Sequence, residues 1–229
     1  MGGDLYALDF DGAAKIRWPW LFGQVDSAME TWIIDQMYIL RPVVETGYEN
    51  LLLVRLLVEL QVPSVRKSSV ADGLTVEAIL ENWWQLKPII MKEWDEERDA
   101  LIDLFGRVRD EWIDNDLSGW IGANRFYPGV ADALRFASSQ LYIVTTKQVP
   151  TQGNHDIHKP KSSSHFLSLA SFVEDRLATL KNVIKEPALA GWNLYLGRWG
   201  YNTEKERAEA ESIPRIQLLD LSDFSKKLK

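Results

Sequence analysis

Short apolar runs that end in polar residues recur along the chain and predict buried β-strands. These runs are residues 5–8, 141–144, 172–173, 194–196 and 215–219. Helical patterns separate the later runs, and strands that alternate with helices are typical of βαβ units in a parallel sheet. The first residues and the C-terminal part of the chain therefore predict an α/β core.

The middle of the chain predicts only helices, because its apolar positions recur every three or four residues. Asp26 is placed to cap a helix that runs to Leu40. Residues 43–60 predict a second helix and residues 75–86 a third. We expect the third to end before Pro88, because proline has no N–H group for the helix ladder.

The clearest helical pattern lies in residues 91–116, whose apolar side chains form a single stripe. We expect one long amphipathic helix there. The segment also holds ten acidic and four basic residues, which supply −6 of the formal charge of −7. Charges on the outer side of such a helix are usually solvated, so the net charge says little about a ligand site.

These elements predict an α/β core split into residues 1–12 and 126–229 by a helical insertion over residues 13–125. Eight of the ten tryptophans lie in the insertion, and we interpret them as its core and docking surface. The alternative, a platform on which bases stack, needs a basic face that an acidic chain does not offer. We therefore expect no nucleic-acid partner.

Composition excludes several kinds of site. The 229 residues include no cysteine, which rules out a disulfide framework, an iron–sulfur cluster, a thiolate zinc site and a cysteine nucleophile. No apolar stretch approaches the roughly 20 residues that span a bilayer, and no targeting segment precedes the first apolar run. We expect a soluble, intracellular, cytoplasmic protein without a membrane partner; its oligomeric state stays open.

Polar side chains follow three of the expected strands. They are Asp9 with Asp11, then Thr145, then Glu174 with Asp175. Because parallel strands end at one edge of a sheet, we expect these groups to meet there. Clustered carboxylates repel one another unless a cation joins them, and hard oxygen ligands favour Mg²⁺. The alternative is that each acid only caps a helix, and three such strand ends together favour a site.

The order of these segments resembles the haloacid dehalogenase-like (HAD) hydrolases. Residues 5–12 resemble the first motif, 127–130 the exit from the cap, 143–147 the second motif, 172–175 the fourth, and 196–201 the fifth strand with its loop. Residues 41–57 and 173–185 are similar to a subgroup found in plants and cyanobacteria. The resemblance covers most of the chain except residues 13–16 and about 149–171.

The resemblance implies a Rossmann-like parallel-sheet core with an α-helical cap inserted after the first strand. It also implies an Mg²⁺-dependent phosphatase that acts on a small phosphorylated metabolite through an aspartyl-phosphate intermediate. Asp9 would be the nucleophile and a metal ligand. Asp11 would be the general acid and base and would bind the metal through its carbonyl oxygen.

The resemblance assigns the remaining roles in the same way. Thr145 would bind the transferring phosphoryl group, with Thr146 and Lys147 beside it as substrate-binding residues. Asp175, with Glu174 next to it, would complete the metal site.

Two departures from the family pattern leave a second function open. The turn between residue 12 and the insertion is short, and only 29 residues separate Thr145 from Asp175. That stretch should carry a helix, a strand and the helix that bears the lysine of the third motif. Lys159 and Lys161 are the candidates for this lysine. The alternative function is a catalytically impaired HAD-like binding or regulatory protein, in effect a shortened isoform.

All three histidines, His155, His158 and His165, fall within this short segment. Their spacing admits a zinc site, but it matches no helix, so we interpret them as surface histidines in a loop.

Overall fold

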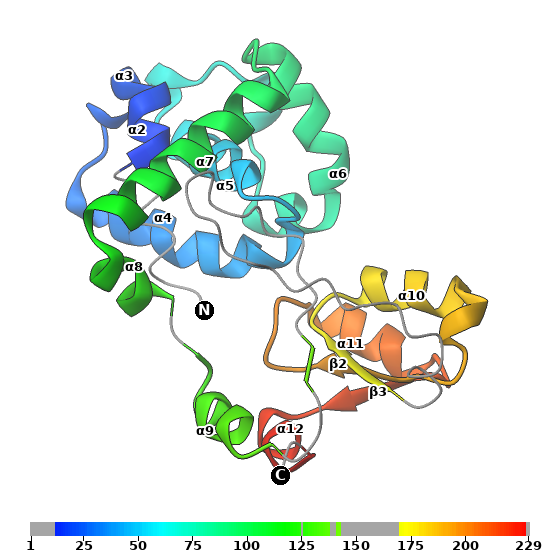
Figure 1. Ribbon diagram of the computed structural model, residues 1–229. Coiled ribbons are helices and arrows are strands. Elements are labelled where there is room, and N and C mark those ends of the chain that lie inside the picture. Colours follow the sequence, from blue (N-terminus) through cyan, green and yellow to red (C-terminus); the bar gives the residue numbers. More distant parts are fainter. Residues whose placement is uncertain (1–11, 125, 138–140, 143–169, 228–229) are drawn as a thin grey trace. The chain divides into compact units, whose positions relative to one another are not determined.

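The computed structural model describes residues 12–124, 126–137, 141–142 and 170–227. The described chain forms two compact units (Figure 1). One unit consists of residues 12–124, and the other contains the described residues from 126 onward. The expected strand at residues 5–8 lies outside the described part of the chain.

The first unit is helical, and its described residues include no strand. Its elements in chain order are α2 (Ala14–Arg17), α3 (Pro19–Phe22), α4 (Ser27–Leu40), the 3-10 helix η2 (Arg41–Val43), α5 (Tyr48–Gln61), η3 (Pro63–Val65), η4 (Ser69–Ala71), α6 (Val76–Glu93), α7 (Arg98–Asn115) and α8 (Leu117–Ala123).

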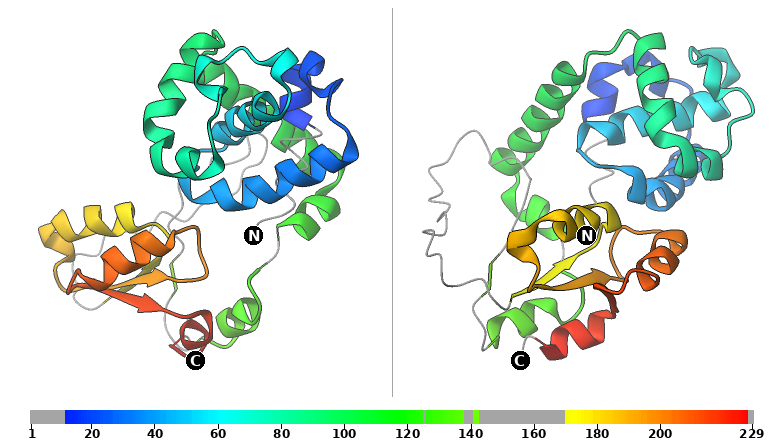
Figure 2. Two further views of the ribbon diagram at one scale, coloured as in Figure 1. Left: turned by 180° about the vertical axis from the view of Figure 1, so that it is seen from behind. Right: turned by 90° about the vertical axis from the view of Figure 1, so that its right-hand side faces the viewer.

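Helix α5 is the centre of this unit. Every residue from Tyr48 to Glu59 is buried, so the helix is enclosed on all sides rather than on one stripe. Helices α2, α4 and α7 contact it (Figures 1 and 2). The core side chains come from all of these helices and from α6. Helices α2, α4 and α7 therefore pack directly on α5, while α3, α6 and α8 contact α2, α4 and α7 respectively.

The N-terminal boundary of α4 confirms the sequence prediction. The Asp26 carboxylate accepts a hydrogen bond of 2.8 Å from the N–H of Met29, and the helix ends at Leu40. The prediction that Pro88 ends the third helix is wrong, because α6 continues to Glu93. Buried Trp83 and Ile90 hold the helix to the core on either side of the proline.

The prediction of one helix over residues 91–116 is also wrong, because α6 ends at Glu93 and α7 begins at Arg98. Asp95 has a positive φ of 55°. The N–H of Asp95 donates to the carbonyl of Lys92, and the N–H of Glu96 donates to that of Met91. This is a Schellman ending, which turns the chain sharply between the two helices.

Helix α5 also begins later than predicted, at Tyr48 rather than at residue 43. Gly47 immediately precedes it and faces the ring of Phe105 in α7. A Cβ atom on Gly47 would lie 2.2 Å from that ring, so any larger residue here requires the Phe105 side chain to move.

The second unit is built on a small parallel sheet. Its described elements are α9 (Val130–Arg135), β1 (Ser171–Glu174), α10 (Leu177–Lys185), η5 (Pro187–Leu189), β2 (Asn193–Gly197), α11 (Glu204–Glu211), β3 (Ile216–Leu219) and α12 (Leu221–Lys227). The strands run parallel in the order β1-β2-β3. The sequence therefore predicted all three of these strands and their parallel arrangement.

Successive side chains of β2 point to opposite faces of the sheet, and each face is in contact with helices. Leu194 and Leu196 join a core with side chains of α10 and α11, which contact each other. Tyr195 points to the opposite face, where Lys227 of α12 lies 5.0 Å from its ring centroid. Figure 2 shows the helices around the sheet.

The expected strand at 141–144 is not formed at its first two residues. Leu141 and Tyr142 have no regular structure and are exposed, and residues 143–144 lie outside the described part of the chain. The chain is therefore a mixed α/β protein with a small parallel sheet.

We expect Gly47→Ala to destabilise the helical unit by about 1–3 kcal/mol, because the added methyl group overlaps the Phe105 ring and displaces it from its packed position. Gly122→Ala in α8 is the matched control, since nothing lies within 4 Å of its added Cβ. The control should be neutral or stabilising by about 0.5–1 kcal/mol. Urea unfolding followed by tryptophan fluorescence measures both variants, and equal effects would contradict the packing argument.

Candidate functional site

The structure tests only part of the expected site. The following residues lie outside its described part: Asp9, Asp11, Thr145, Thr146, Lys147, Lys159 and Lys161. The three histidines lie there as well. Of the expected metal ligands, Glu174 and Asp175 are described.

Glu174 and Asp175 lie at the carboxyl end of β1, as the sequence predicts. Asp220, a residue the sequence analysis did not single out, directly follows β3. Two strand spacings separate β1 from β3, which places Asp220 about 10 Å from Asp175. Asp220 is 3.8 Å from the guanidinium of Arg198. The edge of the sheet thus carries acids at both outer strands, with a basic residue after the middle strand.

The loop after β2 holds Asp175 in place. The N–H of Tyr201 donates to a carboxylate oxygen of Asp175 at 3.1 Å. The side-chain amide of Asn202 donates to the carbonyl of Asp175 at 2.9 Å and to the carbonyl of Gly197 at 2.9 Å. Asn202 is buried and therefore joins the ends of two neighbouring parallel strands. Nothing in the local sequence pattern marks this residue, because its contact with Asp175 spans 27 residues of the chain.

Gly200 allows this loop to approach β1 closely. A Cβ atom at Gly200 would lie 2.1 Å from the Cβ of Asp175, which leaves no space for any other residue. Before it, the ring of Trp199 packs against Tyr127 and Phe224, with centroids 6.5 and 5.4 Å away. The loop is therefore held by a tight backbone contact on one side and by aromatic packing on the other.

A short series of hydrogen bonds continues from this loop into α11. Arg207 donates to the backbone carbonyl of Asn202 at 2.8 Å and to its side-chain oxygen at 3.0 Å. Thr203 caps α11 in a reciprocal capping box with Glu206. Since the helix start is fixed in this way, Asn202 and the carbonyl of Asp175 are fixed with it.

Burial, together with the charge of Asp175, raises the pKa of Glu174. A hydrogen bond from Thr179 opposes this shift. The result is a pair of adjacent carboxyl groups whose mutual repulsion a cation would relieve. Within the described residues, however, no group of three acidic or histidine side chains is placed to hold a metal ion. At this strand end the described residues therefore provide two adjacent carboxyl groups and no third acidic or histidine ligand.

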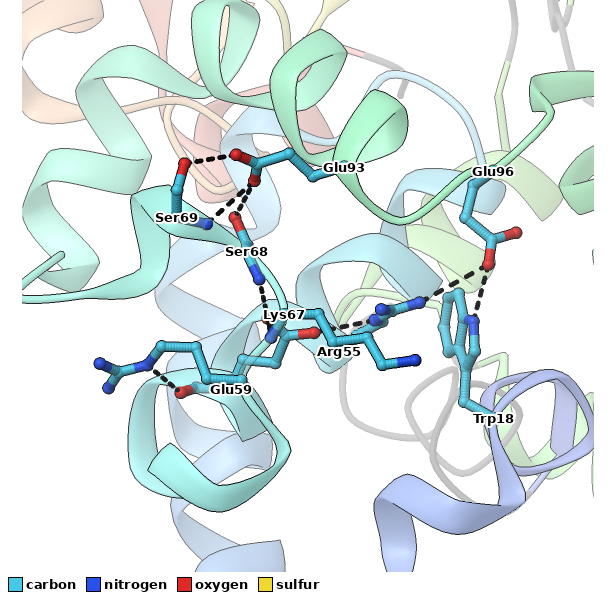
Figure 3. A network of polar contacts seen from close by, with 9 residues as sticks. Trp18, Arg55, Glu59, Lys67, Ser68, Ser69, Glu93 and Glu96 are labelled. Carbon is cyan, nitrogen blue, oxygen red and sulfur yellow. Dashed lines mark hydrogen bonds and ion pairs between the residues drawn. The ribbon is translucent and has the colours of Figure 1, made fainter.

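A second cluster of buried charges lies in the helical unit (Figure 3). Arg55 and Glu59 form an ion pair one turn apart on α5, with 3.0 Å between Nε and Oε1. Their side chains are 2% and 0% exposed. Glu96, which is 3% exposed, lies 3.6 Å from the other end of the same guanidinium. The two carboxylates offset the charge that the core encloses.

Three tryptophan rings surround this guanidinium. The ring centroids of Trp18, Trp20 and Trp94 lie 5.1, 5.5 and 4.1 Å from its central carbon. The indole N–H of Trp18 donates to Glu96 at 2.8 Å. Burial lowers the pKa of Arg55, while the hydrogen bond and charge of Glu59 act in the opposite direction. The cluster already fills its own space with protein groups, so we interpret it as structural.

Glu59 connects α5 to the segment that follows it. Its second carboxylate oxygen accepts hydrogen bonds from the N–H groups of Lys67 and Ser68, at 2.9 and 2.8 Å. Ser68 in turn donates through its hydroxyl to Glu93 at the end of α6, at 2.7 Å. The sequence carried a signal for this cluster, because Arg55 and Glu59 are the two charges inside an apolar run and stand one helical turn apart.

No family model, no curated protein and no solved structure matches this chain. None of the helices in the described ranges is long and apolar enough to cross a membrane.

We expect Asn202→Ala to destabilise the second unit by about 1–3 kcal/mol, because the carbonyl of Asp175 loses the Asn202 donor and the link from Asp175 to the carbonyl of Gly197 is broken. Asn193→Ala, at an exposed position in the first residue of β2, is the control and should have little effect. Amide hydrogen exchange of β1 and β2 reports the difference. Unchanged protection in Asn202→Ala would show that this amide does not join the strands.

We expect Arg55→Met to cost the helical unit about 3–5 kcal/mol, because the buried carboxylate of Glu59 loses its counter-charge, whereas Glu96 keeps its ion pair with Arg17. Arg98→Met is the control, since Arg98 is more than half exposed and its pair with Asp99 lies at the surface. The control should cost less than about 1 kcal/mol. Urea unfolding followed by tryptophan fluorescence distinguishes the two, and similar midpoints would contradict the role given to Arg55.

Proposed function

We propose that the chain is an Mg²⁺-dependent HAD-like hydrolase that removes phosphate from a small phosphorylated metabolite. One observation carries the proposal: Asp175 stands at the carboxyl end of a parallel strand and is held there by the loop of the next strand. In open α/β sheets, ligands bind at the carboxyl ends of the strands, which is where Asp175 lies. The order of motifs that resembles this family supports the same conclusion.

The chemistry of the donor set suits Mg²⁺, because carboxylate oxygens are hard ligands and a cation relieves the repulsion between Glu174 and Asp175. Asp9 and Asp11 would supply the other ligands. Bound Mg²⁺ would offset the charge of the phosphate during the reaction. Residues that follow the expected strand at 5–8 would thus complete the site.

Within this proposal, the side chains divide the work of phosphoryl transfer. A carboxylate oxygen of Asp9 attacks phosphorus and forms an aspartyl phosphate while the bond to the leaving oxygen breaks. Asp11 protonates that leaving oxygen and later takes a proton from the attacking water. Thr145, Thr146 and Lys147 bind the phosphoryl group.

Two further parts of the chain have roles in the proposal. Lys159 or Lys161 provides a positive charge beside the nucleophile and the phosphate. The helical insertion acts as the cap that closes over the substrate and excludes water.

Hydrolysis of an aryl phosphate with Mg²⁺ tests the proposal. We expect Asp9→Asn to lower the rate by a factor on the order of 10³ or more, since the nucleophile is lost. Asp175→Asn should raise the Mg²⁺ concentration needed for half-maximal rate by at least about tenfold. Asp223→Asn is the control, because Asp223 pairs with Lys226 at an exposed position in α12 and should leave the rate unchanged.

A rate at background level in the unaltered chain, equal to that of Asp9→Asn, would overturn the proposal. Mg²⁺-dependent stabilisation of the chain that Asp175→Asn abolishes, without any hydrolysis, would support the impaired binding or regulatory protein instead.

A further inference from the structure

An exposed serine, Ser69, begins η4 and follows two basic residues in the segment after η3. Ser69 follows Arg66 by three positions and Lys67 by two. Protein kinases select substrates by such charge patterns, and one large class reads basic side chains at these two positions before a serine. The sequence of this segment therefore presents a kinase recognition pattern that the hydrolase proposal does not use.

The backbone of this segment suits recognition, whereas the Arg66 guanidinium is engaged: it donates to the carbonyls of Glu59 and Leu60 and pairs with Asp72. A kinase that reads Arg66 therefore has to displace these contacts. Arg66 has φ −62° and ψ 126°, and Ser68 has φ −84° and ψ 129°, so the segment is already extended. Lys67 and Ser69 are exposed, whereas Ser68 is only 2% exposed. Of the two adjacent serines, the structure therefore offers Ser69.

Ser69 is also part of the contact that ties this segment to α6 (Figure 3). Its hydroxyl donates to one carboxylate oxygen of Glu93, and its N–H donates to the other at 3.1 Å. The hydroxyl of Ser68 donates to Glu93 as well. The two hydroxyl groups lower the pKa of Glu93, so this carboxylate is charged at neutral pH.

We propose that Ser69 is a phosphorylation site for an arginine-directed serine/threonine protein kinase, and that phosphorylation releases residues 66–69 from α6. In the reaction the Oγ atom forms a bond to the γ-phosphorus of ATP. The bond from that phosphorus to the bridging oxygen breaks, and ADP leaves. The hydroxyl proton goes to the catalytic aspartate of the kinase.

The release follows from charge. A phosphate on Ser69 carries about −1.5 to −2 at pH 7 and replaces a donor with acceptor oxygens. It faces the charged carboxylate of Glu93, which it repels, and it competes for the N–H of Ser69. The neighbouring N–H groups of Lys67 and Ser68 bind Glu59, so a released segment also loosens the buried pair with Arg55.

Treatment of the intact chain with ATP and the catalytic domain of such a kinase tests the site, with peptide mass spectrometry as the measurement. We expect phosphate on Ser69, its loss in Ser69→Ala, and its retention in Ser68→Ala. An unmodified Ser69, or phosphate on Ser68 instead, would overturn the proposal.

The proposed release has its own test, which uses the fully phosphorylated chain. Phosphorylation should lower the thermal midpoint of the unaltered protein, and Glu93→Gln should reduce this shift by at least half because the repulsion is gone. An equal shift in both backgrounds, or none in the unaltered protein, would show that the phosphate does not act against Glu93.

Discussion

The buried guanidinium of Arg55 is the interaction on which the helical unit depends. It lies on a helix with no solvated side, so its charge has only protein groups to balance it. Glu59 comes from the same helix, whereas Glu96 comes from the turn between α6 and α7. Because an unpaired charge is far more costly in the core than at the surface, Glu59 is needed beside Arg55, and Glu96 adds a second contact that ties the turn to α5. The tryptophan rings of Trp18 and Trp94 pack on the same guanidinium.

In the second unit, neutral hydrogen-bonding groups satisfy buried polar atoms at the ends of the strands. Its sheet is small, and the ends of β1 and β2 carry carbonyl groups that have no further strand residues to pair with. Asn202 satisfies two of them at once, and Gly200 lets the loop come close enough to do so. Asp175 is fixed as a consequence. A carboxylate held in this way is preorganised for a ligand, which is why the proposed function rests on this edge rather than on the larger charged cluster.

The sequence patterns predicted those elements that depend on interactions between residues close together in the chain. The cap at Asp26 and the three described strands follow from side chains within a few residues of one another. The break before α7 was missed because it depends on Glu96 reaching an arginine far away in the sequence. Asn202 was missed for the same reason, since its acceptor at Asp175 is 27 residues away in the sequence. Of the candidate site, sequence reasoning located Glu174 and Asp175 correctly at a strand end, while the remaining residues stay predictions.

The buried pair of Arg55 and Glu59 also fixes the segment at residues 67–68, because Glu59 accepts from both of its N–H groups. Hydrogen exchange of the Lys67 and Ser68 amides measures this directly. We expect these amides to exchange as slowly as that of Leu57 in the middle of α5, although they lie outside any helix. Exchange as fast as that of Gly73, in the exposed turn that follows, would contradict it.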